Sequence, residues 1–264
     1  NRTSPFAFTG NKFEFRMVGS AANISCPNFI LNTIVAEELR LFAEELEGVR
    51  DFDAALETLM KRTIKEHRRV IFSGNNYSAE WKEEAKRRGL AELKTTVDAL
   101  PLYLTEKNVE LFERHGVLSE SEIHSRTEIL LENYANIVHI EAVTALDMAR
   151  KEITPAIIKY EHLLLSEIKL KESSGALSAK LESGILRRVA ELSEKFADGA
   201  DELENALSSW NAGGSNLEKA TYCRDKLLPL METVRKYADE TELLLGKEYR
   251  PFPSYEDILY SVKY

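Results

Sequence analysis

The sequence predicts a mainly α protein that begins with a short β segment and continues into an antiparallel helical bundle. Residues Phe13 to Arg16 alternate apolar and charged side chains, which is the period of a half-buried strand. From Asn28 onward, apolar residues recur at helical spacing over long stretches. Short turns rich in serine and glycine separate the last of these stretches, and helices joined in this way pack antiparallel.

Local signals place the first elements. Gly10 and Asn11 stand between the aromatic run Phe6–Phe8 and the strand, which predicts a hairpin turn. A first helix is expected from Asn28 to Gly48, with its glutamates on the solvated side. A second helix is expected from Asp51 to His67.

A short helix is expected next, over Ala79–Arg88. Two large aromatic residues belong to this region: Tyr77 lies just before the helix and Trp81 lies within it. Two large aromatic side chains at this place are more typical of packing anchors than of ligand stacking.

The longest helix begins at a capping box formed by Ser119 and Glu122, and its apolar spacing continues to Leu165. Pro155 should kink or end this helix, because its ring removes one hydrogen bond and crowds the preceding turn. Three further helices are expected, over Ala176–Trp210, Asn216–Leu245 and Tyr255–Tyr260.

Composition excludes several classes of protein. The 264 residues are 44% hydrophobic and 30% charged, which is typical of a globular chain of one large or two modest domains. The formal net charge of −9 argues against nonspecific nucleic-acid binding. Cys26 and Cys223 lie far apart and form no CxxC, so neither a disulfide framework nor a zinc site is indicated. No apolar run approaches the ~20 residues that span a bilayer, and no signal peptide is evident, so we expect a cytoplasmic protein.

The candidate site lies on the first strand. Strand alternation puts Glu14 and Arg16 on one face, about 7 Å apart along the backbone at ~3.4 Å per residue. A carboxylate and a guanidinium so placed can hold two parts of one polar ligand, such as a metal ion and an anion. Arg2 and Lys12 add positive charge nearby, which favours a phosphate or carboxylate substrate. The alternative is an amphipathic edge strand whose charged face simply meets water.

The helices carry no recognisable catalytic set. A glutamate-rich bundle can hold a di-iron site, but no Glu-x-x-His occurs, and HExxH, GxSxG, GxGxxG and the P-loop pattern are absent too. The five histidines are most simply surface or satisfied core positions; they are His67, His115, His124, His139 and His162.

Several motifs together resemble a known family. The segments NRT at residues 1–3, KFEFR at 12–16 and AAN at 21–23 are similar to the closing motifs of the glutamine synthetase catalytic domain. The sequence of residues 1–16 resembles that of the type III branch of the family. Further similarity runs through Ser73–Trp81, Leu131–Ala142, Met148–Ala156 and Arg250–Tyr260, and it is weakest over 165–214.

This resemblance implies an architecture and an assembly. Residues 1–72 would be the C-terminal piece of the α+β catalytic domain, and residues 73–264 a helical C-terminal region with a long-helix bundle. The other metal carboxylates, a metal histidine and the base that deprotonates ammonium would precede Asn1, so this chain alone should be inactive. The intact enzyme would be a homo-oligomeric ring, in stacked hexamers. The alternative is a non-catalytic helical scaffold or oligomerisation module.

The resemblance also implies a reaction and residue roles. The family uses ATP to convert glutamate and ammonia into glutamine through γ-glutamyl phosphate. Glu14 would be a ligand of the Mg²⁺ or Mn²⁺ ion that bridges the ATP phosphates, and Arg16 would be catalytic and hold the glutamate side chain or the phosphoryl group. Arg2 would stabilise charge on the transferring phosphoryl group of the nucleotide. Lys12 stands near the nucleotide, where the family often has arginine.

Overall fold

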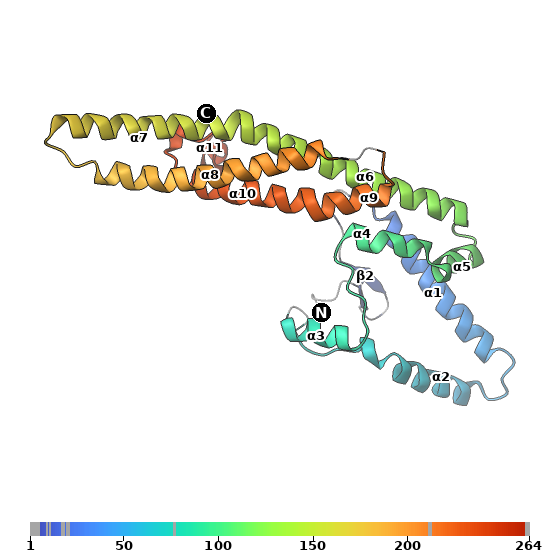
Figure 1. Cartoon of the computed structure of the whole chain (residues 1–264). Helices are drawn as coiled ribbons and strands as arrows, with labels where there is room; N and C mark the ends of the chain where they lie inside the picture. The colour runs from blue at the N-terminus through green and yellow to red at the C-terminus, as the bar shows by residue number, and fades with distance from the viewer. Residues whose placement is uncertain are drawn as a thin grey trace. The chain divides into compact units, whose positions relative to one another are not determined.

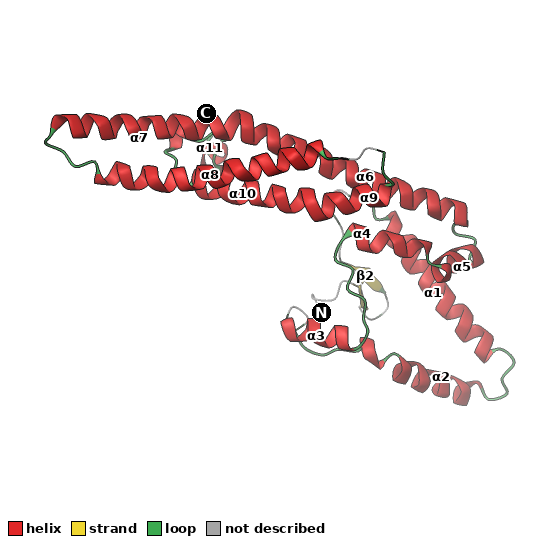
Figure 2. Cartoon of the chain, in the orientation of Figure 1, coloured by secondary structure: helices red, strands yellow, loops and turns green. Residues whose placement is uncertain are grey.

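The computed structural model describes residues 6–8, 10, 12–16, 19, 22–75, 78–210 and 213–261. The chain divides into two compact units, residues 1–127 and 128–264, and the boundary falls within one long helix. Helices make up nearly all of the described elements (Figures 1 and 2), so the mainly α prediction is confirmed. The predicted boundary between a catalytic-domain piece (residues 1–72) and a helical C-terminal region (residues 73–264) stays a prediction.

The first unit starts with a strand pair and continues as short and medium helices. Its elements are β1 (Phe6–Phe8), β2 (Phe13–Phe15), α1 (Ser25–Leu46), α2 (Phe52–Glu66), η1 (Arg68–Val70), α3 (Ala79–Arg87), α4 (Thr96–Ala99), η2 (Leu100–Leu104) and α5 (Glu106–Arg114), followed by the start of α6 (Glu120–Met148).

The core of the first unit forms where α1 meets α5 and the start of α6. Phe112, Leu118 and Ile123 are buried there, and Phe29 of α1 packs edge-on against Phe112 with 5.9 Å between the ring centroids. Burial of these side chains stabilises the contact between α1, α5 and the start of α6, whereas Ile34, Val35 and Leu39 of α1 are exposed.

Glu37 ties α1 to α5 through four charged or polar contacts. Its carboxylate accepts from Arg40 at 2.8 and 3.0 Å, from Arg114 at 2.5 Å and contacts the His115 ring at 2.8 Å. The Glu37 side chain is only 14% exposed. The hydrogen bonds from Arg40, followed by that from His115, hold the pKa of Glu37 far below its ordinary value of 4.5.

Acid should therefore weaken the first unit through Glu37. Because its pKa is depressed in the folded state, ionised Glu37 contributes stability above pH 4.5, and this contribution is lost as the pH falls below that value. We expect the urea midpoint of the wild type to fall more steeply between pH 6 and pH 3 than that of Glu37→Gln.

The neighbouring Glu38 provides the control for this measurement, since it is exposed and makes no ion pair among the described residues. Glu38→Gln should keep the pH dependence of the wild type. Parallel curves for the wild type and Glu37→Gln would contradict the assigned role.

Trp81 anchors the chain after α2, which agrees with its predicted role as a packing residue. Phe72 stacks on its ring with 3.8 Å between the centroids, and the Arg88 guanidinium lies 5.3 Å from the same ring. Arg88 also donates to the carbonyl oxygens of Arg69 and Ile71 at 3.3 and 2.9 Å. The segment around η1 is thus held against α3. Tyr77 lies outside the described residues.

The second unit is built from long helices. The continuation of α6 passes through a π-helical turn, η3 (Ala149–Ile153), into α7 (Thr154–Ser174). The remaining elements are α8 (Lys180–Ser208), α9 (Asn216–Tyr222), the π-helical η4 (Cys223–Leu227), α10 (Leu228–Glu242), η5 (Lys247–Tyr249) and α11 (Tyr255–Leu259).

Three of these helices pack side by side. Gly175 ends α7 in the left-handed conformation with φ of 65°, and a short turn then returns the chain along α7 as α8. α10 packs against α8 as well, as Figure 1 shows. The buried positions of α8 recur every three or four residues, namely Val189, Leu192, Phe196, Gly199, Ala200 and Leu203. The full antiparallel bundle expected from the sequence stays a prediction.

Pro155 does not end the long helix. The five residues before Thr154 take π-helical geometry, and the Thr154 hydroxyl donates to the Ala149 carbonyl at 2.8 Å. This wider turn accommodates the missing N–H of the proline and the bulk of its ring, which an α-helical turn cannot do without strain. Pro229 follows η4 in the same way. The predicted capping box is confirmed, because the Ser119 N–H and hydroxyl both donate to Glu122 at 2.8 Å.

Within the described ranges, none of the helices combines the length and the apolar character that crossing a membrane requires.

Candidate functional site

The N-terminal strands form an antiparallel pair in which Phe6 faces Phe15, Ala7 faces Glu14 and Phe8 faces Phe13. Gly10 lies between them with φ of 98°, a conformation that glycine adopts without strain, as a tight turn requires. The predicted strand at residues 13–15 and the predicted pairing are confirmed. Asn11 lies outside the described residues.

Glu14 and Arg16 lie on the same side of this strand pair. The Arg16 Nε and Nη2 groups both donate to Oε2 of Glu14, at 3.1 and 2.9 Å. The side chains lean together, so their charged ends come much closer than the backbone spacing of two residues. The strand therefore presents a carboxylate and a guanidinium as one unit.

Exposure shows which face of the strand is covered. The Glu14 side chain is 39% exposed and that of Arg16 is 27% exposed. Phe13 is 55% exposed and Phe15 37%. The alternation predicted from the sequence is present, but within the described residues the charged face is covered at least as well as the aromatic one. A simple edge strand with its charges in water and its aromatic rings buried would show the opposite.

The pair can be opened at modest cost. Ion pairs that remain in contact with water contribute ~0–1 kcal/mol, so an incoming cation or anion can replace one partner without a large penalty. Lys12 is exposed just before β2 and adds positive charge close to the pair in sequence. Arg2 lies outside the described residues, so the structure does not place it relative to Glu14.

The Glu14 carboxylate is the type of ligand that a hard divalent cation prefers, but it does not supply enough ligand atoms by itself. Mg²⁺ requires near-octahedral oxygen coordination, and one carboxylate supplies only part of it. Across the described residues, no cluster of three or more histidine, cysteine, aspartate or glutamate side chains could hold a metal ion. A metal bound at Glu14 would therefore need further ligands from outside this group of residues.

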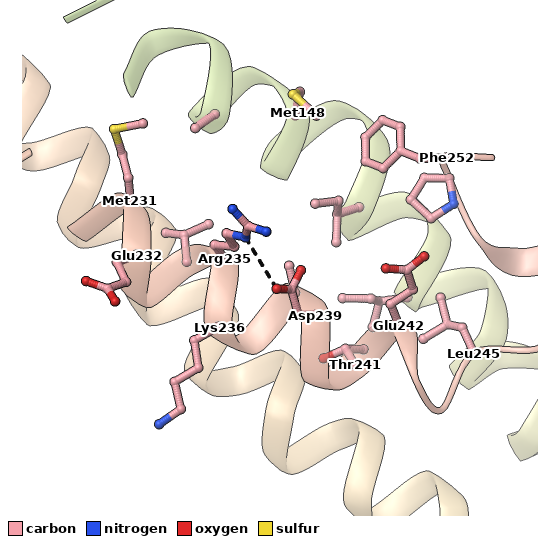
Figure 3. Close-up of a pocket in the computed structure, with 16 residues that line it drawn as sticks. Met148, Met231, Glu232, Arg235, Lys236, Asp239, Thr241, Glu242, Leu245 and Phe252 are labelled. Atoms are coloured by element: carbon pink, nitrogen blue, oxygen red, sulfur yellow. Dashed lines mark hydrogen bonds and ion pairs between the residues drawn. The ribbon is translucent and has the colours of Figure 1, made fainter. Parts of the chain in front are cut away.

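A cavity of about 820 Å³ in the second unit was not anticipated from the sequence. Met148, just before the η3 turn, and Phe252 line it together with residues of α10 (Figure 3), and Ile153 at the end of η3 lines it too. Arg235 and Asp239 of α10 lie over it as an ion pair at 3.4 Å. Pro155 is the sequence feature that lies between two of its lining residues, Ile153 and Ile157.

This apolar cavity holds no catalytic set. Its carboxylates and cations all come from α10, and most of its wall is apolar. The free thiol of the second unit, Cys223, is fully buried beside α6, where its Sγ lies 3.5 Å from the Ala135 carbonyl oxygen. Burial raises the pKa of Cys223 to about 11, which keeps it an unreactive thiol at neutral pH.

The sequence is similar to known proteins along its whole length. A family described as the glutamine synthetase C-terminal domain matches residues 55–172. A glutamine synthetase of Butyrivibrio fibrisolvens is 35% identical over 271 residues, covering 100% of this chain and 38% of the relative. A type-3 glutamine synthetase of Dictyostelium discoideum is 35% identical over 268 residues, covering 98% and 36%. A glutamine synthetase of Bacteroides fragilis is 31% identical over 274 residues, covering 99% and 37%. The chain thus spans slightly more than a third of the length of these relatives.

Proposed function

Since this chain belongs to the glutamine synthetase family and matches its type III branch, we propose that it is the C-terminal part of a glutamate–ammonia ligase. The reaction would join glutamate and ammonia at the expense of ATP, through γ-glutamyl phosphate. Residues 1–72 would complete the catalytic domain, and residues 73–264 would form the helical C-terminal region. The cytoplasm is the expected location.

The observation that carries this proposal is the Glu14–Arg16 pair. A carboxylate and a guanidinium share one side of a strand and remain partly open to solvent. Charge neutralisation is the main demand of phosphoryl transfer, because negative charge spreads over the transferring oxygens. Glu14 would provide one oxygen ligand to Mg²⁺ or Mn²⁺, and the remaining ligands would come from other parts of the enzyme.

Arg16 would orient the substrate. Its planar guanidinium forms paired hydrogen bonds to carboxylate and phosphoryl oxygens, and two of its N–H groups already hold a carboxylate in this way. Once Glu14 engages a cation, Arg16 can transfer these hydrogen bonds to the glutamate side chain or to the phosphoryl group. Lys12 and Arg2 would add positive charge near the nucleotide.

Replacing the guanidinium by an ammonium tests the role of Arg16. In the full-length enzyme, Arg16→Lys keeps the charge but loses the fork of donors, so we expect the KM for glutamate to rise or kcat to fall by about tenfold or more. Steady-state assays with glutamate, ammonia and ATP measure this. Arg50→Lys makes the same change at an exposed arginine just before α2 and should leave both constants unchanged, and unchanged constants in Arg16→Lys would contradict the proposed contact.

Assembly into a homo-oligomeric ring of stacked hexamers is a further part of the proposal. α6 exposes Ile137, Ile140 and Val143 to 57%, 63% and 47%, and contiguous apolar surface of this kind is commonly covered by a partner. The same surface favours the alternative function, a helical oligomerisation module without chemistry. The two differ in whether substitution of Glu14 abolishes glutamine formation.

A further inference from the structure

A second cavity, in the first unit, is lined mainly by cations. It has a volume of about 800 Å³ and lies where the end of α2, η1 and the end of α3 meet. Six of its nine lining residues carry positive charge and one carries negative charge; the cations are Lys61, Lys65, Arg68, Arg69, Arg87 and Arg88. We propose that this basic cavity binds small, multiply charged phosphate compounds, independently of the reaction proposed above.

The cations fall into two groups. Arg87 and Arg88 both donate to Glu84, at 2.5–2.8 Å, so their side chains are held in place and their charge is partly neutralised. Lys61 pairs with Glu57 on the exposed face of α2. In the described part of the chain, the side chains of Lys65, Arg68 and Arg69 make no ion pair or hydrogen bond. Three cations therefore remain available to an anionic ligand.

Helix stabilisation explains only part of this cluster. Cations in the last turn of a helix interact favourably with its dipole, which accounts for Lys65 on α2 and Arg87 on α3. Arg68 and Arg69 come after α2 has ended, and both lie in the short η1 turn. The Arg88 contacts to the Arg69 and Ile71 carbonyls hold that turn against α3. The fold thus concentrates like charges at one place in a chain whose net charge is −9.

The shape and walls of the basic cavity favour a small phosphorylated ligand. Its volume lies within the ~300–1,000 Å³ typical of small-molecule sites. Arginine forks match phosphate oxygens, and exposed Ile64 and Ile71 offer apolar wall to an organic group. Nucleic acid is disfavoured, because such partners need an extended basic surface on a protein that is usually basic overall.

Calorimetric titration of the 264-residue chain with sodium tripolyphosphate tests this proposal. The double variant Arg68→Gln/Arg69→Gln should bind about tenfold more weakly or worse, the order expected for losing two charge-assisted contacts at an open site. The matched control Arg50→Gln/Arg187→Gln removes the same charge from two exposed arginines elsewhere and should bind like the wild type. Both residues replaced in the test variant are exposed, and thermal melting checks that each variant folds.

Three outcomes would overturn the proposal. These are equal affinity in the wild type and the double variant, an equal loss in the matched control, and binding of a single-stranded oligonucleotide without binding of tripolyphosphate. Titration with ATP tests the apolar wall, which should make ATP bind at least as tightly as tripolyphosphate. Lys12→Gln separates this site from the proposed catalytic one. If Lys12→Gln loses tripolyphosphate binding and the double variant keeps it, the anion binds near the strand pair. This result would contradict the cavity proposal and leave the proposed function untouched.

Discussion

In the full-length enzyme, Glu14→Ala should lower glutamine formation by at least about a hundredfold while the fold stays intact. The substitution removes a carboxylate proposed to bind a divalent cation, and no described neighbour can take its place, because no described residues form a metal-binding cluster. It also removes the carboxylate oxygen to which Arg16 donates two hydrogen bonds. Glutamine formation at saturating ATP, glutamate and ammonia, measured over a range of Mg²⁺ and Mn²⁺ concentrations, gives the readout.

The control and the competing function are tested in the same experiment. Glu47→Ala removes an exposed carboxylate just after α1 and should leave turnover unchanged. A helical scaffold predicts instead that Glu14→Ala has no effect and that only substitutions along the long helix matter. Unchanged turnover in Glu14→Ala, at any metal concentration, would refute the metal role and favour the scaffold.

Leu203→Ala should destabilise the second unit by about 3–5 kcal/mol. Leu203 is fully buried on α8, among the side chains that α8 turns toward α7 and α10. Truncation removes apolar contacts and leaves a void that long, rigid helices cannot close. Such a loss is a large share of the ~5–15 kcal/mol that holds a typical domain folded. Urea unfolding followed by circular dichroism measures it.

The same helix provides the matched substitution. Leu181 is also on α8, but it is 70% exposed. Leu181→Ala makes the same chemical change and should shift stability by no more than about 0.5 kcal/mol. Similar losses in both variants would mean that α8 does not form the core of the unit.

Residue patterns along the chain were sufficient for the local structure. The alternation at residues 13–16 predicted a strand that is present at Phe13–Phe15, and the Ser119–Glu122 capping box marks the start of α6. Both signals depend on residues that are close in sequence, so the strand and the helix start are largely independent of tertiary packing. The motifs around KFEFR also carry the resemblance to the family, because they are a matter of residue order alone.

Pro155 shows where local rules were not enough. Pro155 was expected to kink or end the helix; the helix does not end there but continues through a π-helical turn. Packing decides between these results. Apolar positions on both sides of the turn are buried, Ala142 before it and Ala156 and Ile157 after it, and ending the helix would expose them.

The sequence by itself determined the helical character of this protein, the position of its first strand and the family to which it belongs, because each depends on residue order within short segments. Only the tertiary structure decided that Glu14 and Arg16 join as an ion pair and that Arg87 and Arg88 meet Arg68 and Arg69 around one cavity. Residues about twenty positions apart become neighbours only when the segment around η1 packs against α3. That packing arises from side chains such as Phe72 and Trp81, whose partners no local pattern reveals.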